Sequence, residues 1–313
     1  MASSKSPVLS VIVPVFNEKL CLEELCQRLY QVLKDMRLSY EVLFIDDGST
    51  DGSLELLLDL KKKFKPMKII RFARNYGQHP AVTAGMAQSR GQVIVTLDAD
   101  LQNPPEEIPK LVDALQQGYD IAAGWRKHRE DSIFRTFPSL IVNRLISRVT
   151  TVKLHDYGCM LRAYSRILVD RYLKCEERAS YITALMNLLS RKVIEVPVRH
   201  DARTKGKSKY RFLSLVNFVL NIMIGFSDYP IRLVSYTGFL FSLLGIGLGI
   251  ELLVYRFLHG TSGGSGLTSF VAVMLVLFGF QFVLLGLIGE YLARIYSEVQ
   301  KRPRYIVDKI FIS

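Results

Sequence analysis

The chain has few cysteines, and their spacing matches no common metal or redox site. None of the four belongs to a C-x-x-C pair or has a histidine partner in register: Cys21, Cys26, Cys159 and Cys175. We therefore expect reduced, structural thiols of the kind found in cytosolic domains. The sequence also lacks the P-loop, G-x-S-x-G and H-E-x-x-H motifs, which argues against P-loop nucleotidases, serine hydrolases and zinc proteases.

Acidic residues are in the minority, with 29 Asp and Glu against 41 Lys and Arg and a net charge of +12. A basic excess indicates nucleic acid, an anionic membrane surface or phosphorylated substrates as partners. No helix-turn-helix, zinc-finger or aromatic RNA-binding motif accompanies it, so we expect no nucleic-acid partner. The N-terminal residues 1–7 are polar and lead straight into an apolar strand, so we expect no secretory signal there.

Apolar, β-branched runs alternate with segments of helical periodicity over the first hundred residues. Strands are expected at 9–15, 41–45, 67–72 and 92–97, and helices at 23–36, 51–64 and 80–89. Short connections between such elements predict an α/β domain with a Rossmann-like, mostly parallel sheet. Further strands are expected at 195–198 and 305–311. The last of these needs a sheet edge, from its own domain or from a neighbouring subunit.

Two of the predicted strands end in pairs of carboxylates. Asp98-Ala99-Asp100 closes the run 92–97 and is followed by Gln102, whereas Asp46-Asp47 closes the run 41–45. A lone D-x-D is as often a polar strand exit as a cation site. Two acidic ends at the ligand-binding edge of one sheet favour a site, because ligands collect at the carboxyl ends of parallel strands. Asp46-Asp47 would suit ribose hydroxyls or a base edge, and Asp98-Ala99-Asp100 a cation bridging phosphates.

Basic residues cluster in two later segments. Arg126, Arg135 and Arg144 belong to the first, which continues as an amphipathic stretch near 134–152. A surface helix docked on the core explains this stretch as well as a helix lying in a membrane interface does. The second segment, 199–211, contains Lys205 and is either a solvated loop or a clamp for phosphates. A further amphipathic helix is expected near 211–227.

Two long apolar segments follow Pro230. Residues 233–250 and 267–289 contain no charged side chain, and each is long enough to cross about 30 Å of hydrocarbon. The linker 259–266 has no Lys or Arg, whereas Lys and Arg flank the other ends of the two segments. The positive-inside rule therefore predicts a transmembrane hairpin with the N-terminal domain and the C-terminus in the cytosol. A buried helical hairpin in a soluble protein is the alternative.

The expected organisation has three parts. Residues 1–228 form the α/β domain with its amphipathic helices. Residues 229–296 form the hairpin, with spans near 232–257 and 267–293, and residues 297–313 form a cytosolic tail with a strand.

Several of these motifs resemble a known enzyme family. Residues 11–18 (VIVPVFNE), 46–49 (DDGS) and 97–105 (LDADLQNPP) resemble the inverting, GT-A-fold glycosyltransferases of family 2. The apolar hairpin is similar to that of members acting on polyprenyl phosphates. Residues 74–79, 103–109, 156–164 and 289–305 further resemble the subgroup that transfers a formamido-arabinose to undecaprenyl phosphate for lipid A modification in bacteria.

The resemblance implies roles for individual residues. It implies a catalytic Asp156, and Mg²⁺ or Mn²⁺ held by Asp100 with Gln102. The nucleotide-sugar would be bound by Pro14, Phe16, Glu18, Asp46, Asp47, Asp98, Ala99, Arg203 and Lys209. The acceptor phosphate would meet Arg126, Arg135, Arg144 and Lys205.

The same resemblance implies partners and a location. We expect a UDP-sugar donor, undecaprenyl phosphate, the lipid bilayer of the bacterial inner membrane, and a homo-tetramer. The only tryptophan, Trp125, follows a glycine and lies outside any Q-x-x-R-W motif, which disfavours processive polymerisation. A glucosyl- or mannosyltransferase to undecaprenyl or dolichyl phosphate is the main alternative, and a non-catalytic membrane subunit is a distant one.

Overall fold

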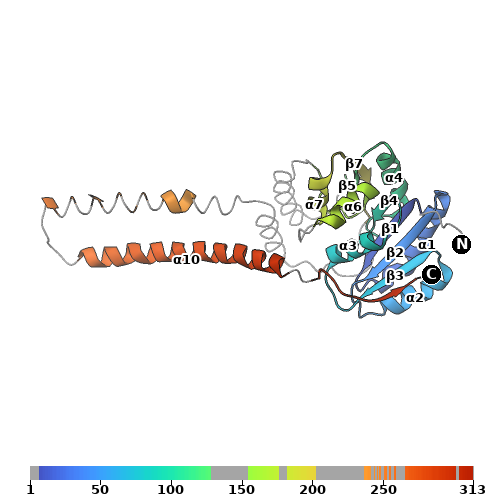
Figure 1. Ribbon diagram of the computed structural model, residues 1–313, viewed down its shortest axis with the longest axis horizontal. Coiled ribbons are helices and arrows are strands. Elements are labelled where there is room, and N and C mark those ends of the chain that lie inside the picture. Colours follow the sequence, from blue (N-terminus) through green and yellow to red (C-terminus); the bar gives the residue numbers. More distant parts are fainter. Residues whose placement is uncertain are drawn as a thin grey trace. The chain divides into compact units, whose positions relative to one another are not determined.

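The structure of the protein is a computed structural model (Figure 1). It describes residues 7–127, 154–175, 182–201, 236–240, 265–300 and 303–312, with single positions between 243 and 258. Its contacts divide the chain into two compact units, residues 1–219 with 303–313 and residues 220–302. The first unit therefore combines the N-terminal two thirds of the chain with its C-terminal end.

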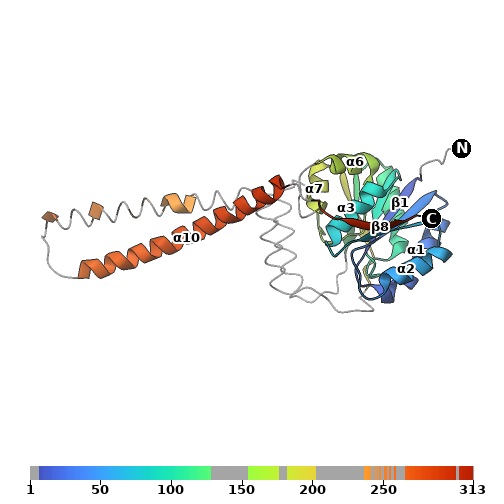
Figure 2. The same ribbon diagram turned by 60° about the horizontal axis from the view of Figure 1, so that its bottom comes forward.

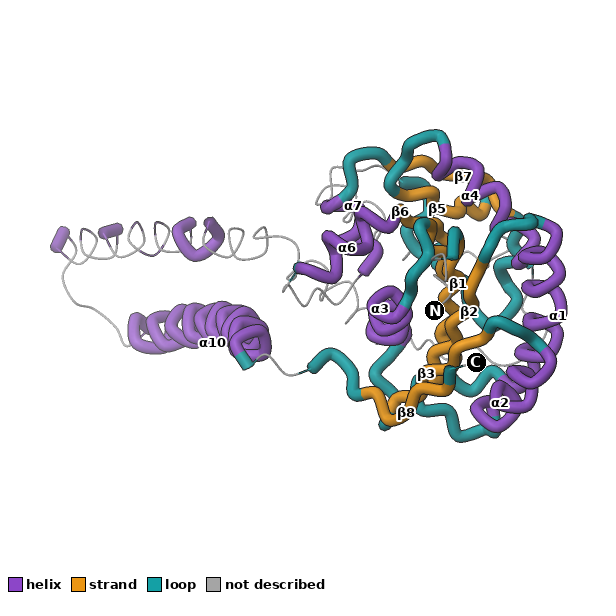
Figure 3. Tube along the Cα trace, turned by 45° about the vertical axis from the view of Figure 1, so that its right-hand side comes forward, coloured by secondary structure: helices purple, strands orange, loops and turns teal. Residues whose placement is uncertain are grey.

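An eight-stranded sheet organises the first unit, in the order β7-β5-β6-β4-β1-β2-β3-β8 (Figures 1 and 3). The pairs β1–β2, β1–β4, β2–β3 and β5–β7 are parallel, as the alternating pattern predicts. The strands are β1 (Leu9–Val15), β2 (Tyr40–Asp46), β3 (Met67–Phe72), β4 (Val93–Thr96), β5 (Ile121–Arg126), β6 (Arg162–Ser165), β7 (Val193–Val198) and β8 (Val307–Phe311).

Helices cover both faces of the sheet, which explains why the strands are almost continuously apolar. Along β1, Val11 and Val13 pack into one core and Ile12 into the other. The first core lies under α1 (Lys19–Asp35), α2 (Ser53–Lys63) and α4 (Ile108–Gln116), with the short 3₁₀ helix Pro105–Glu107 leading into α4. The second lies under α3 (Gln78–Gln88), α6 (Arg166–Lys174) and α7 (Ile182–Leu189). Figure 2 shows α3 and α6 from a second direction.

Two antiparallel strands complete the sheet. β6 lies between β4 and β5 and runs against both, and β8 runs against β3. The expected C-terminal strand therefore pairs within its own sheet, which decides between the two alternatives left open by the sequence. The four cysteines, all within the described residues, form no disulfide, and three of them are buried.

The second unit contains the long helix α10 (Ser265–Val299). Many of its apolar side chains are exposed, among them Phe270, Phe278, Phe282, Leu292 and Ile295. A search of the described residues found no helix with both the length and the apolar character needed to cross a bilayer. The amphipathic segments near 134–152 and 211–227, and most of the first expected span, lie outside the described residues.

Candidate active site

The two acidic strand ends lie on the same edge of the sheet, as expected. β2 and β4 are the parallel neighbours of β1 on either side, so their carboxyl ends flank the end of β1. Pro14 lies within β1 opposite Ile45, and Phe16 and Glu18 follow the strand. The amide of Asp47 donates to the carbonyl of Val15 at 2.8 Å, which ties the end of β2 to the end of β1.

Asp47 holds the loop that follows β3. Its Oδ1 accepts a hydrogen bond from the amide of Tyr76 at 2.7 Å, and its Oδ2 accepts one from the amide of Gly77 at 2.8 Å. Burial raises the pKa of Asp47, and the two backbone donors act against this rise. Burial also raises the pKa of Asp46, whose Oδ1 accepts from the amide of Ser49 at 3.2 Å. The carboxylate of Asp47 thus fixes the backbone of Tyr76 and Gly77 beside the end of β2.

The D-x-D segment is held by amide side chains. Nε2 of Gln78 donates to Oδ1 of Asp98 at 2.5 Å, and Nδ2 of Asn103 donates to Oδ2 of Asp98 at 3.4 Å. Burial and the neighbouring Asp100 raise the pKa of Asp98 to about 7. The side chain of Ala99, expected at the nucleotide, lies in the core with 4% exposed. A nucleotide would therefore meet only the backbone of this residue.

The chemistry of this acidic pair fits a divalent cation shared with a substrate. Among the described residues no group of three or more His, Cys, Asp or Glu side chains forms a cage for a metal ion. The backbone amide of Gln102 donates to Oδ1 of Asp100 at 3.1 Å. Two carboxylates together with a nearby glutamine supply oxygen atoms of the kind that Mg²⁺ binds along with substrate phosphates and water. Leu101, between Asp100 and Gln102, has a φ of 62°, a strained value for a leucine.

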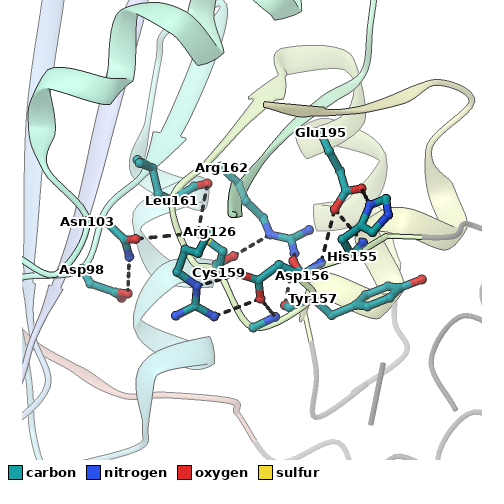
Figure 4. Close-up of polar contacts among 11 residues, drawn as sticks. Asp98, Asn103, Arg126, His155, Asp156, Tyr157, Cys159, Leu161, Arg162 and Glu195 are labelled. Carbon is teal, nitrogen blue, oxygen red and sulfur yellow. Dashed lines mark hydrogen bonds and ion pairs between the residues drawn. The ribbon is translucent and has the colours of Figure 1, made fainter. Parts of the chain in front are cut away.

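A buried ion pair lies beside the acidic pair. Arg126 at the end of β5 donates from Nε to Oδ2 of Asp156 at 2.6 Å and from Nη2 to Oδ1 at 2.9 Å (Figure 4). Oδ1 of Asp156 also accepts from the amide of Gly158 at 3.1 Å. Asp156 is 3% exposed. This bidentate arrangement fixes the plane of the carboxylate and occupies both of its oxygens.

Arg162 and Glu195 hold the segment that carries Asp156. The guanidinium of Arg162, fully buried in β6, donates to the carbonyls of Asp156, Tyr157 and Cys159 at 3.2, 3.1 and 2.8 Å (Figure 4). Glu195 in β7 accepts from the amide of Asp156 at 3.2 Å. The polypeptide around Asp156 is therefore fixed by two charged side chains from β6 and β7, the strands on either side of β5.

A thiol–amide contact connects the two halves of the site. Sγ of Cys159 lies 3.8 Å from Oδ1 of Asn103, the residue whose amide nitrogen donates to Asp98 (Figure 4). Burial raises the pKa of Cys159 to about 11, so its thiol stays neutral and can donate.

The structure thus brings together most of the expected site and leaves part of it untested. Asn103, three residues after Asp100, belongs to the site as one of the polar residues that follow the D-x-D segment in the sequence. Gln78, Arg162 and Glu195 also belong to the site and were not predicted, because no local pattern points to them. Five expected basic residues fall outside the described ranges: Arg135, Arg144, Arg203, Lys205 and Lys209.

Comparison with known proteins agrees with this geometry. Residues 10–173 match the family described as Glycosyl transferase family 2. A protein of Klebsiella pneumoniae (strain 342) named undecaprenyl-phosphate 4-deoxy-4-formamido-L-arabinose transferase is 42% identical over 304 residues, 96% of this chain and 93% of its own. A protein of the same name from Pseudomonas fluorescens (strain SBW25) is 43% identical over 96% of this chain and 89% of its own.

Solved structures share the fold. A mannosyltransferase from Pyrobaculum calidifontis, in complex with GDP-Man and Mn²⁺, covers 95% of this chain and 87% of its own, with a TM-score of 0.52 at 15% identity. Glucosyl-3-phosphoglycerate synthase from Mycobacterium tuberculosis, in complex with Mn²⁺, UDP and glucosyl-3-phosphoglycerate, covers 70% of this chain and 78% of its own. Its TM-score is 0.51 at 16% identity. These similarities identify the α/β unit as a GT-A fold.

Proposed function

Because the chain belongs to glycosyl transferase family 2, we propose that it transfers a single sugar from a UDP-sugar to undecaprenyl phosphate with inversion. The proposed sugar is 4-deoxy-4-formamido-L-arabinose. The observation that carries this proposal is identity of 42% and 43% to transferases of that name over 96% of the chain. The acidic edge beside a buried Arg–Asp pair supplies the groups that such a transfer needs.

Asp100 and Gln102, next to Asp98, are the residues proposed to hold a divalent cation. When bound there, Mg²⁺ or Mn²⁺ would offset the charge that develops on the departing diphosphate. The pKa of Asp98, raised to about 7 by burial and Asp100, supports this assignment, because two adjacent carboxylates without a cation repel each other. We expect Asp100→Asn to lower the turnover rate at least about a hundredfold, since the Lewis-acid contribution is several kcal/mol.

We propose that Asp156 acts through its charge and position. A phosphate monoester has a second pKa of about 6, so the acceptor is mostly ionised at neutral pH and needs no strong base. Both oxygens of Asp156 are engaged by Arg126, which further disfavours proton abstraction. Arg126, the residue expected at the acceptor phosphate, would link Asp156 to that phosphate.

A pH–rate profile of Asp156→Asn tests this role. We expect a rate lowered about a hundredfold with an acidic limb at the wild-type position, because a positioning charge does not titrate in the reaction. Loss of the acidic limb in the variant would show that Asp156 accepts a proton.

The sugar is tested with purified full-length protein in lipid nanodiscs containing undecaprenyl phosphate. The protein is incubated with a panel of UDP- and GDP-sugars, and the lipid product is weighed by mass spectrometry. A product formed only from the UDP-linked formamido-arabinose supports the proposal. A hexose product would instead favour a glucosyl- or mannosyltransferase. UDP binding without any product would favour a non-catalytic subunit.

The finer organisation is also proposed. We propose that residues 232–257 and 267–293 form a hairpin across the bacterial inner membrane, with the α/β unit and the C-terminus in the cytosol. The segments near 134–152 and 211–227 would lie at its surface, and the protein would assemble as a homo-tetramer. The uncharged runs and the exposed apolar side chains of α10 support the hairpin.

Cysteine labelling tests the orientation. In a Cys175→Ser background, an impermeant maleimide should label Ser262→Cys in intact spheroplasts and Ser4→Cys only after lysis. The reverse pattern would contradict the proposed orientation. Cross-linking and light scattering of the detergent-solubilised protein test the tetramer.

A further inference from the structure

The C-terminal tail, residues 303–312, lies against the strand that leads into the active-site loop. Its strand β8 pairs antiparallel with β3, and Val307 lies opposite Phe72 at the end of β3 (Figure 3). The contact continues past the strands, because the amide of Ala73 donates to the carbonyl of Ile306 at 3.1 Å. The tail thus contacts the first residue of the segment 73–77, which we call the β3–α3 loop.

Aromatic rings extend this contact into the loop. The ring of Tyr305 stacks on that of Phe72 with centroids 5.0 Å apart and planes 10° apart. The same Phe72 ring meets the Tyr76 ring edge-on at 5.7 Å and 88°. Phe72 is 1% exposed, so its position is set by these neighbours and the core. The tail therefore reaches Tyr76 through one intervening ring.

The β3–α3 loop contacts both acidic strand ends. The amides of Tyr76 and Gly77 bind the carboxylate of Asp47 at the end of β2. The next residue, Gln78, donates to Asp98 after β4. A displacement of the loop would therefore move groups at both ends of the proposed donor pocket together.

The tail is also anchored on its other side. Nη1 of Arg304 lies 3.4 Å from the hydroxyl of Tyr172 in α6, and that hydroxyl pairs with Oγ1 of Thr83 in α3 at 2.7 Å. Arg71 and Asp308 form an ion pair at 3.5 Å across β3 and β8. Tyr305 thus lies between the contact of Arg304 with α6 and the ion pair of Asp308 with β3.

We propose that Tyr305 is a positioning residue for the donor site. Its ring fixes Phe72 and Tyr76 and thereby holds the β3–α3 loop over Asp47 and Asp98, which sets the affinity for the nucleotide part of the donor. This inference rests on the proposed function in assuming a nucleoside-diphosphate donor. It adds that a residue beyond α10, far from the acidic motifs in sequence, determines donor binding.

The test compares three variants of the full-length protein in detergent. UDP binding in the presence of Mn²⁺ is measured by calorimetry, and the KM for the donor is measured with kcat. We expect Tyr305→Ala to weaken UDP binding at least tenfold and to raise the donor KM with little change in kcat. Tyr305→Phe keeps the stacked ring and should bind UDP within twofold of wild type.

Phe311→Ala is the matched control. Phe311 lies at the other end of β8, opposite Ile69, and packs into the opposite core. Its truncation loosens the same strand without touching Phe72 or the loop. We expect a loss of thermal stability comparable to that of Tyr305→Ala, with UDP affinity within threefold of wild type.

Hydrogen exchange of the loop amides provides a readout independent of the donor. In Tyr305→Ala, peptides covering residues 72–78 should exchange at least tenfold faster than in wild type and in Phe311→Ala. Unchanged exchange, or equal losses of affinity in the two alanine variants, would overturn the inference. Wild-type protein that binds neither UDP nor GDP would overturn the proposed function instead, and the exchange comparison would still decide the role of Tyr305.

Discussion

Arg162 is a charged side chain with no exposed surface, and its Nε and Nη2 atoms donate to backbone carbonyls. Hydrogen bonds from a charged donor contribute about 1.5–3 kcal/mol each, and buried acceptors left without donors are costly. We expect Arg162→Met to lower the free energy of unfolding by about 3 kcal/mol and to reduce activity by releasing the segment around Asp156.

Thermal unfolding with an activity assay checks this expectation. Lys174→Met, which removes one exposed positive charge from the end of α6, is the control and should change stability by less than about 0.5 kcal/mol. Equal stability of the two variants would show that the carbonyls find other donors.

His79 predicts a pH dependence of stability. Burial lowers the pKa of His79 from 6.5 to about 4. Between these values the unfolded chain binds a proton at His79 that the folded protein does not, so the contribution of His79 to stability is full above pH 6.5 and falls as the pH drops toward 4. The loss is at most about 3 kcal/mol, and the position of His79 in the first turn of α3 acts in the same direction. The raised pKa of Asp98 acts in the opposite direction, so the effect of His79 is measured as a difference between wild type and a His79 variant.

Unfolding midpoints measured from pH 5 to pH 8 check this dependence. His79→Gln should reduce the slope below pH 6.5 relative to wild type. An identical slope in both proteins would assign the pH dependence to other groups.

For single residues, the sequence predicted the site residues that directly follow a strand. It did not predict the contacts between site residues that come from different parts of the chain. Asp46, Asp47, Asp98 and Asp100 follow apolar runs, and parallel pairing places such ends on one edge. The pairing of Arg126 with Asp156 joins residues from β5 and from the segment before β6. No local sequence pattern predicts the contact between Arg126 and Asp156, and none predicts the contact between Gln78 and Asp98.

Among the elements, the β3–α3 loop packs against the end of β2 with almost no free space. Gly48 has a φ of +71°, and a Cβ there would lie 2.7 Å from the carbonyl carbon of Arg74 and 2.8 Å from the amide nitrogen of Asn75. Any side chain at position 48 must therefore displace the backbone of Arg74 and Asn75, which, unlike a flexible side chain, cannot adopt another rotamer.

Gly48→Ala should consequently cost more than backbone strain alone. Gly118 also has a positive φ, +91°, but nothing lies within 4 Å of a Cβ placed there, so Gly118→Ala measures the strain by itself. We expect about 1 kcal/mol of destabilisation for Gly118→Ala and at least about 2 kcal/mol more for Gly48→Ala, with weaker UDP binding only in the latter. Chemical denaturation and calorimetry compare the two. Similar values for both would mean that the loop yields without cost.

The strands that the sequence predicted are those with long apolar runs. β1 and β2 are covered by helices on both faces and are almost continuously hydrophobic, whereas β3 combines four buried apolar residues with Lys68 and Arg71. β6 has only four residues, Arg162–Ser165, and begins with a buried arginine, so its composition resembles a loop. Its antiparallel pairing with β4 and β5 depends on long-range contacts, which the alternation of apolar and polar residues in the sequence does not predict.

At the scale of the molecule, the α/β unit is made from both ends of the chain. β8 covers β3, which would otherwise be an edge strand with unpaired backbone groups. Deletion of residues 303–313 should therefore lower the unfolding temperature and promote self-association through β3. Light scattering coupled to size-exclusion chromatography measures this. Deletion of Ile312 and Ser313 alone leaves β8 intact and should behave as wild type, whereas an equally monodisperse 303–313 deletion would contradict the expectation.

The pairing of β3 with β8 also determines when the sheet can be completed during protein synthesis. β3 leaves the ribosome early, but its partner follows only after the whole of the second unit, since Phe72 pairs with Val307. Contacts of such sequence separation form late and slowly. The nascent α/β unit must keep one open sheet edge until the last residues emerge, so a chain interrupted anywhere within residues 220–302 exposes that edge to chaperones and proteases. Pairing of β3 with β8 thus requires that translation has passed residue 311.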